Sequence, residues 1–143
     1  MDQYTTEQFA QRIDHRNPSD KRTFNQRYWK NDSFFEPTDG PVFLYLCGEW
    51  TCTPPNEKMF PMIVGADNQA MLMSLEHRYY GESQPFDDWS VENLEYLTSQ
   101  QALADICAFI DAQNDAMGRV AEWIVIGGSY PGALAAWFKS QYP

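Results

Sequence analysis

The sequence predicts an α/β fold in which short buried strands alternate with helices. A continuous apolar run at 42–47 is typical of a strand buried on both faces of a parallel sheet, and the run at 70–75, apolar except for Ser74, predicts a second buried strand. A third apolar run at 123–126 is followed by a glycine turn and by helix formers at 133–139. Functional groups of such sheets collect at the carboxyl ends of the strands, so the loops after these runs should converge.

The elements before the first buried run are predicted from turn residues and alternation. Residues 1–22 form a polar N-terminal segment with a turn at 17–21, and rough alternation of apolar and polar residues predicts a strand at 23–29. The buried strand at 42–47 leads into a loop at 48–58, where two adjacent prolines exclude regular structure.

The middle of the chain predicts one further strand and one long helix. The run at 70–75 is expected to be a strand, although its Met and Leu residues leave a helix open. The sequence at 98–101 matches a capping box and predicts a helix that ends near residue 113. Its apolar stripe at helical spacing consists of Leu103, Ile106, Cys107 and Ile110.

The composition limits the classes of partner. The 143 residues are 43% hydrophobic, enough for one domain or part of one. A net charge of −10 argues against nucleic acid, anionic membranes and phosphate-rich partners. Neither a membrane span nor a signal peptide is visible, so we expect the protein to be cytosolic or to lack its true N-terminus. A glycosylation sequon at 31–33 gives weak support to a secretory route.

The cysteines and histidines predict neither a metal site nor a bound cofactor. No Cys-x-x-Cys pair is present, and His15 and His77 both lie far from any cysteine in the sequence. A disulfide between Cys47 and Cys52 stays open, because the redox compartment is unknown. Cys107 is expected to be a core residue on the face of its helix.

The glycine turn after residue 126 has the form of a nucleophile elbow. Ser129 stands at the tip, where a strained strand-to-helix turn pushes a hydroxyl out at the edge of the sheet. The N–H of Tyr130, at the start of the helix, would point at a developing oxyanion. Small residues must flank such a turn, and here they are Gly127, Gly128 and Gly132.

Two other interpretations of this turn stay open. Pro131 replaces the second glycine of G-x-S-x-G, so the serine of a glycine-rich turn could be incidental, although proline is acceptable in a first helical turn. A phosphate loop has the same strand, loop and helix order, but it would continue with Gly-Lys-Ser/Thr. Here Ala133 and Leu134 follow Gly132, which favours the nucleophile.

Five segments of the chain have a familiar sequence and follow one another in a fixed order: 24–29, 40–46 with 48–49, 76–83, 97–105 and 127–137. Together they resemble the S28 family of serine peptidases. The resemblance implies the N-terminal portion of an α/β-hydrolase fold through the nucleophile elbow, with residues 23–143 as a partial catalytic domain. It also implies an acyl-enzyme on Ser129 and exopeptidase action on peptides, after proline, in lysosomes, vesicles or secretions.

The resemblance further assigns roles to two loops. Gly48 and Glu49 lie where such hydrolases place the second oxyanion donor, although the family's Gly-Gly-Glu-Gly is Cys-Gly-Glu-Trp here. His77 and Arg78 belong to a loop that braces the site. Arg78 could pair with Glu82, or Glu49 could recognise a substrate terminus; pairing without substrate contact is an equal alternative.

The sequence contains no histidine after Ser129, whereas α/β-hydrolases place the acid and then the histidine after the serine. We therefore expect a chain truncated before both groups and inactive alone. His77 is a poor substitute base, since it is better explained as a hydrogen-bonded loop residue, and His15 is expected to be solvated. An esterase or lipase of the same fold and an inactive paralogue are the rival hypotheses.

Overall fold

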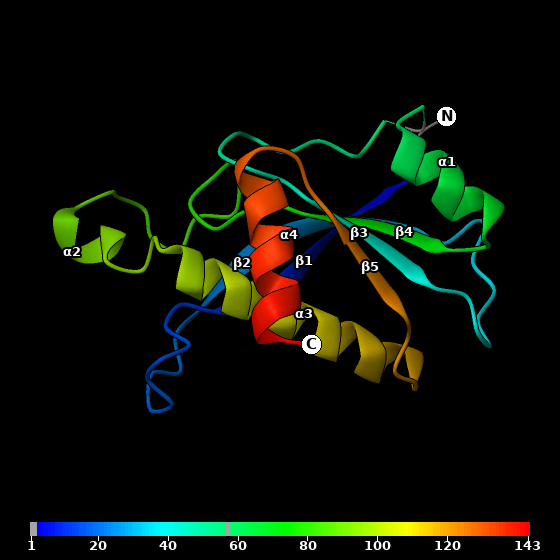
Figure 1. Ribbon diagram of the computed structural model, residues 1–143. Helices are drawn as coiled ribbons and strands as arrows, with labels where there is room; N and C mark the ends of the chain where they lie inside the picture. The colour runs from blue at the N-terminus through cyan, green and yellow to red at the C-terminus, as the bar shows by residue number, and fades with distance from the viewer. Residues whose placement is uncertain (1–2, 57) are drawn as a thin grey trace.

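The protein is described by a computed structural model that covers residues 3–56 and 58–143. Within these residues, a five-stranded sheet has the order β1-β2-β4-β3-β5 (Figure 1). The strands are β1 (Thr5–Arg12), β2 (Thr23–Asn31), β3 (Val42–Leu46), β4 (Met71–Leu75) and β5 (Trp123–Ile126). The helices are α1 (Phe60–Asp67), α2 (Val91–Leu94), α3 (Ser99–Met117) and α4 (Tyr130–Gln141).

The sheet is mixed, and its parallel part positions the candidate site. β1, β2 and β4 pair antiparallel, whereas β4, β3 and β5 run parallel, with Leu44 opposite both Met73 and Val125. Parallel strands end at the same edge of a sheet, so the loops after β3, β4 and β5 lie together. This confirms the predicted convergence.

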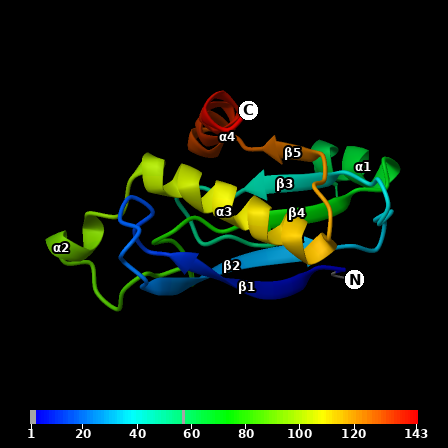
Figure 2. The ribbon, with the colours of Figure 1, turned by 90° about the horizontal axis from the view of Figure 1, so that it is seen from below.

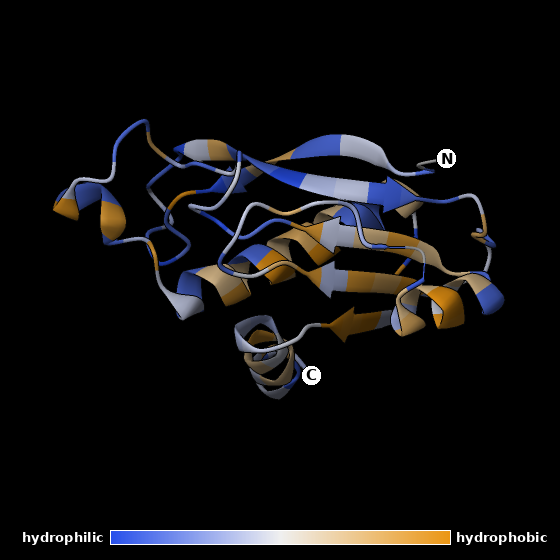
Figure 3. Cartoon of the chain, turned by 90° about the horizontal axis from the view of Figure 1, so that it is seen from above, coloured by the Kyte–Doolittle hydropathy of each residue, from blue (hydrophilic) through white to orange (hydrophobic). Residues whose placement is uncertain are grey.

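Alternate residues of the central strands bury opposite faces of the sheet. Leu44 and Met73 pack into a core beneath α3 and α4, while Phe43 and Leu72 pack against Met62 of α1. α3 therefore crosses one face and α1 lies behind the other (Figure 2). Figure 3 shows the most hydrophobic strands on the α4 side of the sheet, and mixed or polar residues on β1 and β2.

The structure confirms the strands predicted at 23–29, 42–47 and 123–126, and it shows that 70–75 is a strand and not a helix. The sequence did not predict β1, α1 or α2. β1 has little apolar character, and pairing along its whole length with β2 holds it in the sheet. No helix in the described part of the chain combines the length and the apolar character needed to cross a membrane.

The predicted capping box forms on one side only. Thr98 Oγ1 accepts a hydrogen bond from the N–H of Gln101 at 3.2 Å, as expected for the first turn of α3. The Gln101 side chain does not return to Thr98. It donates to Asp14 at 2.6 Å and accepts from the N–H of His15 at 2.9 Å, which ties α3 to the N-terminal segment.

The cysteines divide into a bonded pair and a free thiol. Cys47 and Cys52 form a disulfide, which resolves the alternative that the sequence left open. Cys107 is half-buried on α3, so the expectation that it is a core residue is wrong. Burial is nevertheless the main reason that the pKa of its thiol is raised.

Candidate active site

Ser129 occupies the turn between β5 and α4 in a conformation that L-amino acids rarely adopt. Its φ is 57° and its ψ is −130°, and its side chain is exposed. Such a backbone costs about 1–3 kcal/mol and persists only where the surrounding structure imposes it. The strain places the serine at the outer tip of the turn, as a nucleophile elbow requires.

The tightness of this turn depends on its glycines to different degrees. A Cβ at Gly127 would lie 2.3 Å from the carbonyl oxygen of Pro131, so a side chain cannot fit there. A Cβ at Gly132 would lie 3.1 Å from the Gly127 oxygen, a close but milder approach, whereas Gly128 faces open space. The return of the chain from strand to helix therefore requires glycine chiefly at position 127.

The start of α4 supplies a positively polarised region beside Ser129. Tyr130 is the first residue of the helix, so its N–H has no intrahelical acceptor. Pro131 follows without an N–H of its own, and the helix dipole adds a partial positive charge at this end. An oxyanion that develops next to Ser129 would meet the Tyr130 N–H first.

The loop at 47–52 packs directly against the elbow. A Cβ at Gly48 would lie 2.8 Å from Pro131 Cγ and 2.3 Å from Trp50 Cζ3, so the loop backbone touches the start of α4. The N–H of Trp50 donates to the Gly48 oxygen at 2.9 Å, and this closes a tight turn. The structure thus brings both predicted oxyanion segments to one place.

A pocket of about 230 Å³ opens beside the elbow. Glu49 and Tyr80 line it together with His77 and Tyr130, and its far wall comes from the start of α3 at 97–99. Glu49 is exposed here and carries the only formal negative charge among the lining residues. The pocket is therefore polar and aromatic, and it adjoins the residue that follows Ser129.

His77 is engaged at both ring nitrogens. Nδ1 lies 2.7 Å from the carbonyl oxygen of Arg78, and a carbonyl can only accept, so Nδ1 carries the proton. Nε2 then accepts from the Tyr130 hydroxyl at 2.9 Å. Burial lowers the pKa of His77 and raises the pKa of Tyr130 to about 12. This confirms a hydrogen-bonded loop histidine and leaves no nitrogen free for Ser129.

Arg78 does not pair with Glu82, so this alternative among those that the sequence left open is wrong. Arg78 is fully buried and binds Asp105 of α3 through both carboxylate oxygens, at 2.7 and 2.6 Å. Its remaining N–H groups donate to the carbonyl oxygens of Arg12, Ile13 and Tyr96. Burial therefore keeps Arg78 away from any substrate, and the residue braces the loop from beneath.

His15 also departs from expectation, because it is not solvated. Its Nε2 lies 2.7 Å from Asp105 Oδ1, and only 13% of its side chain is exposed. Asp105 therefore joins the N-terminal segment, the loop after β4 and α3 at one carboxylate. Sequence reasoning missed Asp105, although an acidic residue between Leu103 and Ile106 on a buried helix face is a usable signal.

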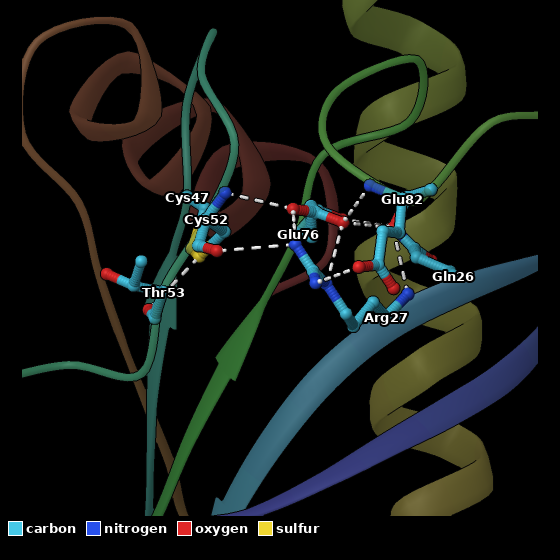
Figure 4. Close-up of a disulfide and its surroundings, with 8 residues drawn as sticks. Gln26, Arg27, Cys47, Cys52, Thr53, Glu76 and Glu82 are labelled. Atoms are coloured by element: carbon cyan, nitrogen blue, oxygen red, sulfur yellow. Dashed lines mark hydrogen bonds and ion pairs between the residues drawn. A yellow bond between two sulfur atoms is a disulfide. The ribbon is translucent and has the colours of Figure 1, made fainter.

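Glu76 is the second buried carboxylate that sequence reasoning missed. It follows β4 directly and is inaccessible to solvent. Figure 4 shows it between Arg27 of β2 and the disulfide-bonded loop that contains Cys52. Arg27 in turn pairs with Glu82 at 2.9 Å, so Glu82 is a partner of β2 and not of the neighbouring Arg78.

The buried state of His77 predicts how stability depends on pH. Because its folded-state pKa is lowered from 6.5, the unfolded chain binds the proton more readily. The stability that neutral His77 contributes is complete above that value and is lost as the pH falls below it. We expect His77→Asn, which keeps a donor near the Arg78 carbonyl, to lose less stability than wild type between pH 7.5 and 5. Urea unfolding at several pH values measures the difference, and parallel curves would contradict it.

Comparisons with known proteins identify the family of the chain. A profile of the family described as Serine carboxypeptidase S28 matches residues 11–143. Probable serine protease EDA2 of Arabidopsis thaliana is 38% identical over 144 residues, which cover 94% of this chain and 29% of that protein. Lysosomal Pro-X carboxypeptidase of Homo sapiens is 39% identical over 155 residues, which cover 98% of this chain and 29% of that protein. The chain therefore spans less than a third of the length of these relatives.

Solved structures show the fold. Oligopeptidase B from Leishmania major superimposes with a TM-score of 0.64 at 18% identity, over 99% of this chain and 19% of that one. The Pyrococcus furiosus esterase Pf2001 superimposes with a TM-score of 0.54 at 14% identity, over 93% of this chain and 44% of that one. The α/β-hydrolase fold predicted from the motifs is confirmed. By its family profile and its relatives, the chain belongs to the S28 family of serine carboxypeptidases.

Proposed function

We propose that the protein is a serine-type peptidase in which Ser129 forms the acyl-enzyme. The observation that carries this proposal is the backbone of Ser129, whose positive φ holds an exposed hydroxyl at the tip of a strand-to-helix elbow. A serine with only a structural role would not need this strained backbone conformation. A nucleophile gains access to a substrate carbonyl and lies beside the N–H groups that begin α4.

The proposed reaction starts with attack by Ser129 Oγ on the scissile carbonyl carbon. A general base takes the hydroxyl proton, and the carbonyl oxygen becomes an oxyanion. The Tyr130 N–H and the backbone of the Gly48–Glu49 loop then stabilise this charge from two sides. Collapse of the intermediate releases the amine, which receives the proton from the base, and water later hydrolyses the acyl-enzyme.

The general base is proposed to be a histidine outside residues 1–143. Within the chain, His77 has both nitrogens occupied by Arg78 and Tyr130, and the His15 Nε2 is bound to Asp105. Neither imidazole is placed to accept the Ser129 proton. A carboxylate that orients the base would also come from outside these residues.

The substrate is proposed to be a peptide that is cleaved after proline from one end of the chain. Relatives named lysosomal Pro-X carboxypeptidase support this specificity, and the pocket beside the elbow offers aromatic walls from Tyr80 and Tyr130. Lysosomal, vesicular or secreted localisation is part of the proposal. The Cys47–Cys52 disulfide supports it, because such bonds persist mainly in oxidising compartments.

Covalent labelling tests the role of Ser129. We expect a fluorophosphonate to label the protein expressed from its complete reading frame, with the adduct mapped to Ser129 by mass spectrometry, since this reagent reacts with an activated serine. The isolated chain 1–143 should react far more slowly, because the base is absent. An adduct elsewhere would overturn the assignment of Ser129. Equal rates for the isolated chain would show that a base lies within residues 1–143.

A further inference from the structure

The loop that carries Gly48 and Glu49 is attached to the sheet at both ends. At its start, the N–H of Cys47 donates to the carbonyl oxygen of Leu75 at 3.1 Å. At its end, the N–H of Cys52 donates to Glu76 Oε2 at 2.9 Å, and the disulfide joins Cys52 back to Cys47. The six residues form a closed ring whose two anchors are consecutive residues at the end of β4.

The Glu76 carboxylate is saturated with donors. Oε1 accepts from Arg27 Nε at 3.2 Å, from the N–H of Glu82 at 3.0 Å and from Ser83 Oγ at 2.9 Å. Oε2 accepts from Arg27 Nη2 at 2.8 Å and from the N–H of Cys52 at 2.9 Å. All five bonds end on a side chain that no solvent reaches, so loss of the carboxylate removes an acceptor from donors at a buried site. Arg27 Nη2 also donates to the carbonyl oxygen of Cys52 at 3.4 Å.

Gly48 is the residue of this ring that packs against the elbow. The Gly48 backbone is close enough to Pro131 that a Cβ would stand 2.8 Å from its Cγ, so the loop has little room to move toward α4. A shift of Cys52 away from Glu76 would move this short ring as a unit. The backbone N–H groups at 48 and 49 would then change their distance from Ser129.

We propose that Glu76 is a positioning residue that holds the Gly48–Glu49 oxyanion loop in register with Ser129. The inference rests on the proposed peptidase function. Glu76 touches neither substrate nor nucleophile, and it acts through the Cys52 N–H and the disulfide-closed ring. The loop can be displaced while the elbow stays intact, because Glu76 has no hydrogen bond to residues of α4.

The donor pattern predicts the effect of Glu76→Gln. A glutamine amide has one oxygen and one NH₂ group, so the NH₂ group must face donors that bound the carboxylate oxygen in wild type. Placing the NH₂ at the Oε1 position conflicts with three donors, whereas placing it at the Oε2 position conflicts with two. The second orientation is favoured, and it leaves the Cys52 N–H facing another donor. The substitution therefore releases the loop in preference to the 82–83 segment.

Glu82→Gln is the matched control. Glu82 binds the same guanidinium, at Arg27 Nη1, but its side chain is 68% exposed, whereas the Glu76 carboxylate is buried and accepts from the Cys52 N–H. Both substitutions remove one negative charge beside Arg27, and only one reaches Cys52. Arg27→Lys is a second variant in case Glu76→Gln does not fold. Lysine keeps the charge, but it loses the bidentate pairing with Glu76 and the bond from Arg27 Nη2 to the Cys52 carbonyl oxygen.

The experiment measures steady-state hydrolysis of a prolyl peptide and amide hydrogen exchange across 48–53 in the protein from the complete reading frame. We expect Glu76→Gln to lower kcat by about 10- to 100-fold with KM changed by less than about threefold, because misplaced oxyanion donors act on the transition state. Exchange at 48–53 should rise at least about tenfold. Arg27→Lys should also lower kcat and raise the exchange rate at 48–53, by smaller factors. Glu82→Gln should change neither kcat nor the exchange rate.

The outcomes separate the inference from the proposed function. Suppose that the wild-type protein hydrolyses the peptide. An unchanged kcat or an unchanged exchange rate at 48–53 in Glu76→Gln then overturns the inference and leaves the proposed function intact. Equal effects of Glu82→Gln and Glu76→Gln overturn it in the same way. If Glu76→Gln does not fold, the same two readouts in Arg27→Lys decide. If wild type neither hydrolyses peptides nor reacts at Ser129, the proposed function fails, and the catalytic part of the inference fails with it.

Discussion

Ser129→Ala should abolish peptide hydrolysis by the protein from the complete reading frame. The substitution removes the one oxygen that forms the acyl-enzyme, and we expect kcat to fall by at least about 10⁴-fold. Stability should stay within about 0.5 kcal/mol of wild type, because the side chain is exposed at the tip of the turn. Turnover of a prolyl peptide and urea unfolding measure the two effects.

Ser140→Ala on the exposed side of α4 is the control for this substitution, since it removes the same oxygen eleven residues along the chain. It should leave both activity and stability unchanged. Activity that survives Ser129→Ala would refute the nucleophile assignment and would favour an incidental serine in a glycine-rich turn. Loss of activity together with unfolding would refute the expectation that Ser129 is dispensable for the fold.

Asp105→Ala should have the largest effect on stability. Asp105 is 1% exposed and Arg78 is fully buried, so the substitution strands a buried cation and also removes the partner of His15. Breaking a buried pair by removing one member costs about 3–5 kcal/mol. Because a domain is stable by only about 5–15 kcal/mol, we expect a large shift in the urea midpoint.

Asp115→Ala is the matched control on the same helix, where the aspartate is exposed. It should change the free energy of unfolding by less than about 0.5 kcal/mol. A similar small change for Asp105→Ala would mean that Arg78 finds other acceptors or water. The carbonyl oxygens of Arg12, Ile13 and Tyr96 would then suffice to hold the guanidinium.

The buried strand at 42–46 and the elbow could be predicted from the sequence alone, and a strand at 71–75 was the favoured alternative there. Buried strands at 42–46 and 71–75 are visible because both of their faces are apolar, and this pattern is local. The elbow is visible because its strand, glycine turn and helix are contiguous. The half-buried β1 and the short α1 left weak local patterns, so only pairing and packing with distant residues define them.

The partners of the buried charges are set by tertiary contacts that no local pattern reveals. Arg78 is four residues from Glu82 but pairs with Asp105, 27 positions away, and Glu76 pairs with Arg27, 49 positions away. Periodicity indicates that a side chain is buried and does not indicate which group neutralises it. That choice follows from how β2, the loop after β4 and α3 meet in space, because a buried charge is stable only where its counter-charge and hydrogen-bond partners are close.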